Sequence, residues 1–196
     1  MTPFELQTHR IPRRAFVIMP FAFAGLVGLT ARKDRQLPEA SEAGTGSKVT
    51  LVIFSENGER KGSVQVNKIV KSEAEWRKEL SGEEYSVTRH QGTEPPFANR
   101  YWNNHQAGIY HCVCCGNALF RSNEKFDSGT GWPSFWAPIA EENVRTRKDV
   151  SLLTERTEVL CTKCDAHLGH VFDDGPAPTG QRYCMNSAAL RFIKLA

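Results

Sequence analysis

Six cysteines are the most chemically versatile side chains in this 196-residue sequence, and four of them have the spacing of metal ligands. Cys112 and Cys115 form one C-x2-C pair, and Cys161 and Cys164 form a second. A two-residue spacing lets both sulfurs of a turn face one ion while backbone amides point at the thiolates. Two such turns supply the four ligands of a closed tetrahedral site. The sequence therefore predicts one structural zinc per chain, bound by these four cysteines.

Other arrangements of the same side chains are open at this point. An oxidising compartment would allow the pairs to form two disulfides, and either His167 or Cys114 could replace one metal ligand. Because two pairs already complete four ligands, the zinc interpretation is the simpler one. Cys114 lies between Cys112 and Cys115 and is then expected to be crowded and inert. The alternative is that Cys114 serves as a resolving or redox thiol.

Cys184 has no cysteine near it in the sequence. A lone buried cysteine usually packs as a small hydrophobic residue. Its neighbours favour another interpretation, because Arg182 supplies positive charge and Asn186 and Ser187 supply polar groups. An electropositive, polar setting favours the thiolate, which is the nucleophilic form of cysteine. We therefore predict that Cys184 is the thiol that does chemistry.

The segment that leads up to the cysteines has the pattern of a β-hairpin. Val49–Phe54 is a run of residues typical of strands, and Ser63–Asn67 alternates between apolar and polar side chains. Asn57-Gly58 lies between them and is a strong turn signal. We expect two paired strands at these positions.

Helix signals follow the hairpin. Ser72 and Glu75 have the spacing of a capping box, which opens a helix. We predict that this helix covers residues 73–80 and that Ser81-Gly82 ends it. A second, short helix is expected around residues 83–85.

Beyond Pro95-Pro96 the helical periodicity is weak, and short apolar runs alternate with glycine, proline and asparagine. Such a pattern indicates a mainly β domain with long loops. A domain with so many loops is expected to need a covalent cross-link or a bound metal to stabilise its core.

The N-terminus forms a distinct unit. Arg13-Arg14 precedes an uncharged, moderately apolar run from Ala15 to Ala31. A basic region followed by an apolar one is the layout of an export signal, and the paired arginines resemble the twin-arginine type. We expect residues 1–31 to be such a signal, with a membrane anchor or a buried hydrophobic N-terminus as the alternatives. Residues 32–47 are polar and rich in glycine and serine, which predicts a linker.

The formal net charge of +3 is unevenly distributed. Residues 1–31 carry a local charge of +2, so the remainder of the chain carries only +1. A body with so little net charge lacks the electrostatic field that attracts nucleic acid or an anionic membrane. We therefore expect no nucleic-acid partner.

Six motifs appear together in one order, and this set strongly resembles the methionine sulfoxide reductase B family. The likeness covers about Glu75 to Lys194. The motifs are Gly92–Phe97, Gly108–Tyr110, Cys112–Phe120, Phe126–Phe135, His167–Pro176 and Arg182–Ser187.

The resemblance implies a reductase domain at residues 48–196. Its fold would be the family's β-tent, which consists of twisted, mostly antiparallel sheets with short N-terminal helices. The resemblance also implies a structural zinc away from the reaction centre. The implied activity is reduction of the R epimer of methionine sulfoxide, free or in proteins, as a repair of oxidative damage.

The resemblance also assigns roles to single residues. Cys184 would attack the sulfoxide sulfur and become a sulfenic acid. His170, with His167, would assist proton delivery to the departing oxygen. The remaining roles are expected of Trp132, which would pack on the substrate's methyl group, and of Arg182 and Asn186, which would orient the thiolate and the bound sulfoxide.

These residues also have plainer interpretations. The two histidines could be core residues or zinc ligands, and Trp132 could be a core aromatic. On that interpretation the chain would be a binding module that zinc stabilises, and Cys184 would have only a structural role. A general thiol–disulfide oxidoreductase is a third class, but both C-x2-C pairs are assigned to metal and no thioredoxin-like βαβ pattern surrounds them.

Thr130 marks a departure from the family pattern. Many relatives carry a resolving cysteine at this position, in a Ser-Gly-Cys-Gly-Trp-Pro motif. We therefore expect an external thiol reductant, thioredoxin- or glutaredoxin-like, to regenerate Cys184. Cys114 or a mixed disulfide are the other routes. We also expect a monomer that is exported to the periplasm or anchored on the outer face of the cytoplasmic membrane, with a cytoplasmic location as the alternative.

Overall fold

The structure is a computed structural model that describes residues 47–150 and 155–195. All described residues belong to a single compact unit. The expected export signal at residues 1–31 lies outside the described residues, and so does nearly all of the expected linker. Among the described residues, no helix combines the length and the hydropathy needed to cross a bilayer.

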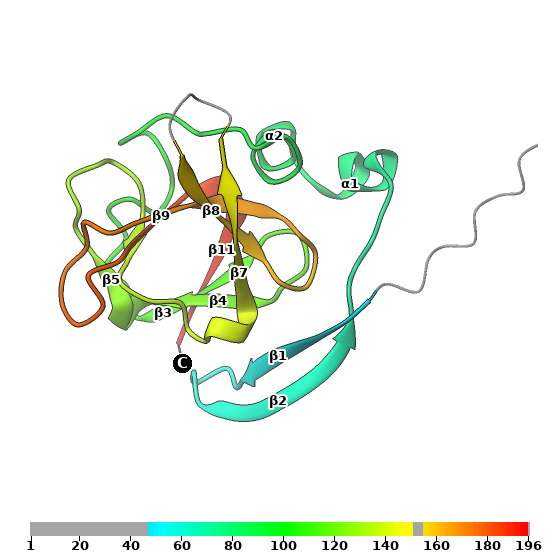
Figure 1. Cartoon of the computed structure of the whole chain (residues 1–196), viewed down its shortest axis with the longest axis horizontal. Helices are drawn as coiled ribbons and strands as arrows, with labels where there is room; N and C mark the ends of the chain where they lie inside the picture. The colour runs from blue at the N-terminus through cyan, green and yellow to red at the C-terminus, as the bar shows by residue number, and fades with distance from the viewer. Residues whose placement is uncertain (1–46, 151–154, 196) are drawn as a thin grey trace, which may run out of the picture. The chain divides into compact units, whose positions relative to one another are not determined.

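The described fold is mainly β, with three antiparallel sheets and two α-helices, as the sequence predicts (Figure 1). A two-stranded sheet pairs β1 (Lys48–Phe54) with β2 (Arg60–Asn67). A three-stranded sheet has the order β11-β3-β4, and a six-stranded sheet has the order β5-β6-β10-β9-β8-β7. The strands of these two sheets are β3 (Gly108–Cys112), β4 (Ala118–Arg121), β5 (Lys125–Phe126), β6 (Ser134–Phe135), β7 (Val144–Asp149), β8 (Arg156–Cys161), β9 (His167–Phe172), β10 (Arg182–Met185) and β11 (Leu190–Lys194).

Two consecutive capping boxes build the helical segment. In α1 (Glu73–Glu79), Ser72 and Glu75 cap each other's backbone amides as predicted. Ser81 and Glu84 do the same for α2 (Gly82–His90), which is longer than the predicted residues 83–85. α1 ends before Ser81-Gly82 as predicted, and Ser81 also caps the next helix. The second helix lies at the predicted place but continues to His90, because the Ser81–Glu84 capping box starts a full helix.

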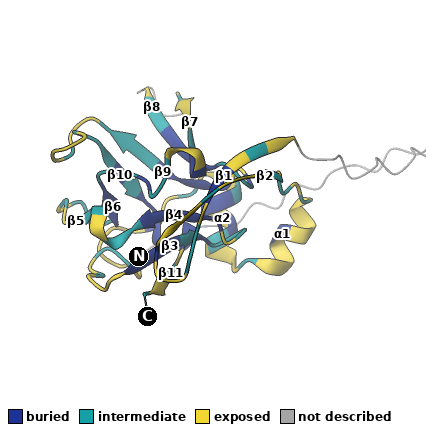
Figure 2. Cartoon of the chain, turned by 90° about the horizontal axis from the view of Figure 1, so that it is seen from below, coloured by how far each residue is buried: buried dark blue, intermediate teal, exposed yellow. Residues whose placement is uncertain are grey.

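The core lies between the three-stranded and the six-stranded sheet. Phe120 of β4 and Phe135 of β6 stack with ring centroids 4.5 Å apart, and Tyr110 of β3 meets Phe135 edge-on at 5.0 Å. All three rings are fully buried. Figure 2 shows buried residues on these strands and mostly exposed ones on α1, whose single buried residue is Trp76. Aromatic packing of this kind fixes the two sheets against each other and so positions the strands that carry the site.

Candidate functional site

A polar row of side chains crosses the six-stranded sheet, and Cys184 is in the middle of it. The register places Arg147 opposite Glu158, Glu158 opposite His170, and His170 opposite Cys184. Ser134 of β6 follows on the other side of Cys184. Directly opposed residues point to the same face of an antiparallel sheet. Two neighbouring strands therefore hold a histidine and a hydroxyl beside the predicted nucleophile.

The opposite face of the same strands is part of the core. Tyr183 of β10 pairs with Phe135 of β6, and both are buried. Because successive side chains of a strand alternate between faces, burial of Tyr183 directs its neighbour Cys184 to the polar face. The alternation of side chains between the two faces along Arg182–Met185 thus places the thiol of Cys184 on the polar face.

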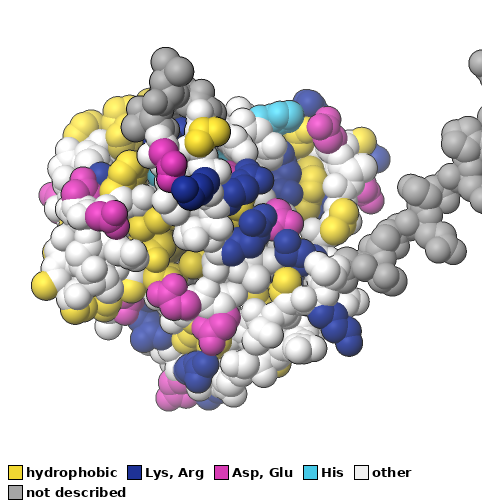
Figure 3. Space-filling model, in the orientation of Figure 1, with side chains coloured by type: hydrophobic (Ala, Val, Ile, Leu, Met, Phe, Trp, Pro, Cys, Tyr) yellow, Lys and Arg dark blue, Asp and Glu magenta, His cyan; other side chains and the backbone are white. Residues whose placement is uncertain are grey.

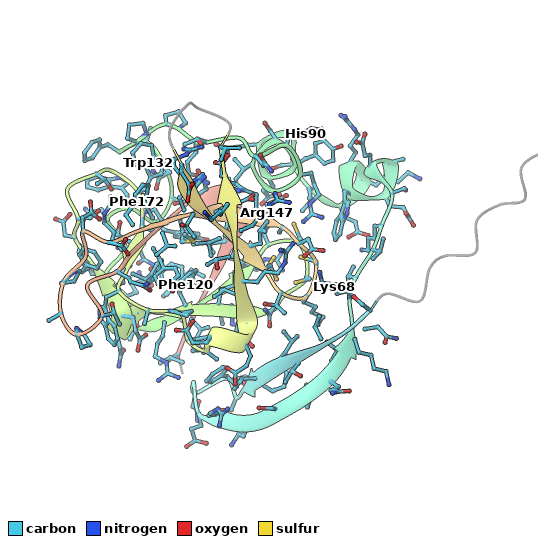
Figure 4. All side chains as sticks on the ribbon, viewed as in Figure 1. Lys68, His90, Phe120, Trp132, Arg147 and Phe172 are labelled. Carbon is cyan, nitrogen blue, oxygen red and sulfur yellow. The ribbon has the colours of Figure 1, made fainter. Side chains whose placement is uncertain are left out.

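Cys184 lines a pocket of about 150 Å³ on this polar face. The pocket is small and takes a side chain rather than a folded partner. Aromatic rings from two parts of the chain contribute to its wall, and Figure 4 labels both of them, Trp132 and Phe172. The lining residues are Thr93, Trp132, Arg156, Gly169, His170, Phe172, Cys184, Met185 and Asn186.

Burial raises the pKa of the Cys184 thiol, and this influence outweighs the groups that lower it. The lowering groups are the positive charge of Arg182 and hydrogen bonds from hydroxyl and guanidinium neighbours. We expected the polar, electropositive setting to favour the thiolate. That expectation was wrong for the free pocket, because removal from water disfavours the charged form more strongly than Arg182 favours it. Burial therefore favours the thiol form of Cys184 in the free pocket.

The structure places Arg182 outside the lining of the pocket. Its guanidinium makes two hydrogen bonds of 2.8 Å to the carboxylate of Asp174 and lies 4.5 Å from the ring centroid of Phe172. Asp174 and Phe172 thus hold Arg182 near Cys184, on the same strand, where it acts on the thiol through its charge.

His170 lines the pocket, and a carboxylate fixes its ring. Its Nε2 lies 2.8 Å from Oδ2 of Asp149, and the same oxygen accepts a hydrogen bond of 2.6 Å from Arg156. A carboxylate can only accept, so Nε2 carries a hydrogen. Nδ1 is then the ring nitrogen that can exchange a proton with a ligand.

His167 is not brought together with Cys184. Its side chain is 3% exposed, lies behind His170 with ring centroids 5.4 Å apart, and does not line the Cys184 pocket. Its Nδ1 lies 2.7 Å from Oε1 of the buried Glu158, whose other oxygen binds Arg147. Burial lowers the pKa of His167, and Glu158 offsets this in part.

Trp132 and Asn186 both line the pocket, and the backbone of Glu94 forms a hydrogen bond with each of them. The backbone oxygen of Glu94 accepts from Nε1 of Trp132 at 3.0 Å, and its backbone N–H donates to Oδ1 of Asn186 at 3.2 Å. The Glu94 carboxylate accepts from the backbone amides of Ser187 and Ala188, three and four residues after the predicted nucleophile. Asn186 also donates to the backbone oxygen of Leu168, so both ends of its side chain are bound within the protein.

Glu94 is 4% exposed, and sequence reasoning did not single it out. Burial raises the pKa of its carboxyl group, and the bonds to the two amides lower it in part. The available signal was an acidic residue before Pro95-Pro96 in a resembling motif. That signal identifies the loop but does not reveal which amides the carboxylate meets.

Thr130 touches the nucleophile. Its Oγ1 lies 4.0 Å from the sulfur of Cys184 and 2.8 Å from the hydroxyl of Ser128, which in turn lies 2.7 Å from the hydroxyl of Ser134. These hydroxyls line one side of the thiol. Cys114 is not in this group, because its neighbours are Cys112, Cys164 and Thr88.

The four predicted metal ligands come together at a second site. The sulfurs of Cys112, Cys115, Cys161 and Cys164 all lie within 4.8 Å of one another. Across the two turns, Cys112 and Cys164 approach to 3.7 Å and Cys115 and Cys161 to 3.5 Å. A tetrahedral zinc with bonds of about 2.3 Å places its sulfurs about 3.8 Å apart, so the donor set fits this ion. All six cysteines are free, and His167 is not part of the cluster.

A family model described as the SelR domain matches residues 80–194. A "Peptide methionine sulfoxide reductase MsrB" from Hahella chejuensis is 60% identical over 127 residues, which are 65% of this chain and 91% of the relative. A protein of the same name from Herminiimonas arsenicoxydans is 58% identical over 125 residues, 64% of this chain and 91% of the relative. "Peptide methionine sulfoxide reductase B1, chloroplastic" from Oryza sativa is 58% identical over 124 residues, 63% of this chain and 58% of the relative. Together with the cysteine cluster and the Cys184 pocket, these matches show that the chain belongs to the methionine sulfoxide reductase B family.

Proposed function

We propose that this protein reduces the R epimer of methionine sulfoxide to methionine, and that Cys184 receives the oxygen. The observation that carries the assignment of Cys184 is its place in the pocket, between His170 and Ser134 on one sheet face. In the reaction, the sulfur of Cys184 loses two electrons and the substrate sulfur gains two. The thiol and the sulfoxide thus become a sulfenic acid and methionine.

The pocket separates the two ends of the sulfoxide group. Trp132 and Phe172 offer apolar surface to the methyl group, and the thiol of Cys184 faces the sulfur. The oxygen must gain a proton as its bond to sulfur weakens. His170 supplies this proton from Nδ1 when both of its ring nitrogens carry hydrogen, as a cationic ring whose Nε2–H pairs with the carboxylate of Asp149.

Arg182 and Asn186 act less directly. The charge of Arg182 lowers the pKa of Cys184 and so opposes the effect of burial. Asn186 contributes to the pocket wall while Glu94 and Leu168 hold its amide. His167 serves as a support for His170 rather than as a group that touches substrate.

The sulfenic acid is then reduced by an external thiol of the thioredoxin or glutaredoxin type. Thr130 supports this proposal, because a hydroxyl lies where a thiol could have attacked Cys184 directly. Two reductant thiols return Cys184 to its thiol form and leave as a disulfide with one molecule of water. The working unit is a monomer.

The four-cysteine cluster binds a structural zinc. Zinc supplies no step of the reaction and instead ties the turn after β3 to the turn after β8. The first 31 residues direct export, so the substrates are oxidised methionines, free or in proteins, outside the cytoplasm.

The test uses a racemic methionine sulfoxide substrate with dithiothreitol. Wild type is expected to consume the R epimer only, and Cys184→Ser is expected to consume neither. Cys114→Ser is the matched control and is expected to retain activity. Full activity of Cys184→Ser would overturn the assignment of the nucleophile, and consumption of the S epimer alone would overturn the proposed substrate.

A further inference from the structure

The β1–β2 hairpin precedes residue 80, where the match to the family domain begins. Figure 1 shows it as a separate ribbon beside the larger sheets. From its contacts we propose that the hairpin is part of the metal site: it holds the Cys161–Cys164 turn closed and thereby slows the loss of zinc. This inference rests on the zinc assigned in the proposed function.

One attachment of the hairpin to the domain is a buried asparagine. Val52 of β1 donates its backbone N–H to Oδ1 of Asn143 at 2.8 Å, and its backbone oxygen accepts from Nδ2 of Asn143 at 2.9 Å. The same Nδ2 donates to the backbone oxygen of Ala118 at 2.9 Å. Asn143 is fully buried. Its side-chain amide therefore pairs with β1 as a neighbouring strand would.

A second asparagine continues this path to a ligand sulfur. The backbone oxygen of Asn143 accepts from Nδ2 of Asn117 at 3.0 Å and from the backbone N–H of Thr162 at 3.2 Å. The amide of Asn117 also donates to the sulfur of Cys161 at 3.6 Å. Groups that donate hydrogen bonds to metal-binding thiolates orient them and tune their affinity for the metal. The hairpin is thus two side chains away from a zinc ligand.

The chain just after β2 binds the same turn from its other side. Ile69 donates its backbone N–H to the backbone oxygen of Lys163 at 2.8 Å. Lys68 pairs with Asp165 at 2.7 Å, and Arg145 shares that carboxylate. Asp165 closes the turn through its backbone bond to Cys161, with φ of 55°. Lysine and arginine side chains gather on this face (Figure 3), and Figure 4 labels Lys68 there.

These two attachments bracket the Cys161–Cys164 turn. Zinc leaves only when a ligand moves away, and movement of this turn breaks bonds on both sides. Loss of the Asn143 side chain would leave the buried N–H and C=O of Val52 without partners, which is costly. The hairpin and the turn are therefore expected to open together.

The experiment measures zinc transfer from the purified, zinc-loaded full chain to a chromophoric chelator. Asn143→Ala is expected to release zinc about ten-fold faster than wild type, and Lys68→Ala is expected to release it faster by a smaller factor. Lys61→Ala is the matched control, because Lys61 is an exposed hairpin residue that forms an ion pair with Glu59, in the loop of the same hairpin. It should release zinc at the wild-type rate. Circular dichroism confirms that each variant is folded.

Several outcomes would overturn the proposal. The proposal is contradicted if Asn143→Ala folds and releases zinc at the wild-type rate. If Asn143→Ala does not fold, the proposal is contradicted when Lys68→Ala releases zinc at the wild-type rate. Wild type without zinc on metal analysis overturns both this inference and the assigned zinc. Wild type with zinc but unchanged release in the variants overturns the role of the hairpin alone. Sulfoxide reduction by freshly loaded Lys68→Ala should equal that of wild type, since Lys68 does not line the Cys184 pocket.

Discussion

At the scale of single residues, the reactivity of Cys184 depends on two opposing influences. Burial raises the pKa of the thiol, and the charge of Arg182 lowers it. Asp174 and Phe172 hold that guanidinium in place. Arg182 therefore lowers the pKa of the nucleophile without lining the pocket.

Replacement of Arg182 by glutamine is expected to raise the pKa of Cys184 further, because it removes the positive charge that lowers it. Since alkylation requires the thiolate, its dependence on pH should move to higher pH in this variant. The rate of alkylation of Cys184 by iodoacetamide measures the shift, and Arg182→Lys should recover much of it. An unchanged profile would mean that Arg182 exerts no charge effect on the thiol.

Glu94 is the second residue whose effect extends beyond its own contacts. In Glu94→Gln, an NH2 group replaces one of the two oxygens that accept from Ser187 and Ala188, so one buried amide loses its acceptor. We expect a loss of about 1–3 kcal/mol in the free energy of unfolding. We also expect a higher KM, because Trp132 and Asn186 are held by the same residue. Urea unfolding and steady-state kinetics test both, with the exposed Glu56→Gln as the control.

At the scale of elements, the site is a property of strand register. The hairpin and the first helix could be predicted because their signals are local: Asn57-Gly58 forms the turn and Ser72 with Glu75 forms the cap. The row from Arg147 through His170 to Cys184 could not be predicted, because pairing between β7, β8, β9 and β10 joins distant parts of the chain. For the same reason the sequence named both histidines but did not reveal that only His170 reaches the pocket.

Because the strand register places only His170 at the pocket, replacement of each histidine is expected to affect the reaction rate differently. His170→Asn is expected to lower the single-turnover rate of sulfoxide reduction by about 10²-fold or more, the usual contribution of a positioned proton donor. His167→Asn should have a smaller effect, since His167 supports His170 from behind. Rapid-quench measurement of methionine formation gives both rates. A larger effect in His167→Asn would contradict the assigned roles.

At the scale of the whole molecule, the zinc cluster joins sequence segments that the sheets alone leave far apart. Cys112 ends β3 of the three-stranded sheet and Cys115 lies in the turn after it, whereas Cys161 ends β8 of the six-stranded sheet and Cys164 lies in the turn after that strand. The spacing of these pairs predicted the cluster from sequence alone because C-x2-C turns have a local geometry. The hairpin's contacts with the second turn gave no such signal, since they depend on Asn117 and Asn143.

Removal of the metal is expected to lower the melting temperature strongly, because metal binding and folding are coupled in such sites. Cys161→Ser should have the same effect and should carry no zinc on metal analysis. Cys114→Ser is the matched control and should keep both the zinc and the melting temperature of wild type. Equal melting temperatures with and without the metal would contradict a structural role for the cluster.

The most direct test of the central claim is one turnover without any reductant. Enzyme is mixed with racemic methionine sulfoxide, treated with dimedone, and mapped by peptide mass spectrometry. We expect one methionine formed per chain, consumption of the R epimer only, and a dimedone adduct on Cys184. Methionine formation with no adduct on Cys184, or with a Cys114–Cys184 disulfide in its place, would contradict the proposed path of the oxygen to an external thiol.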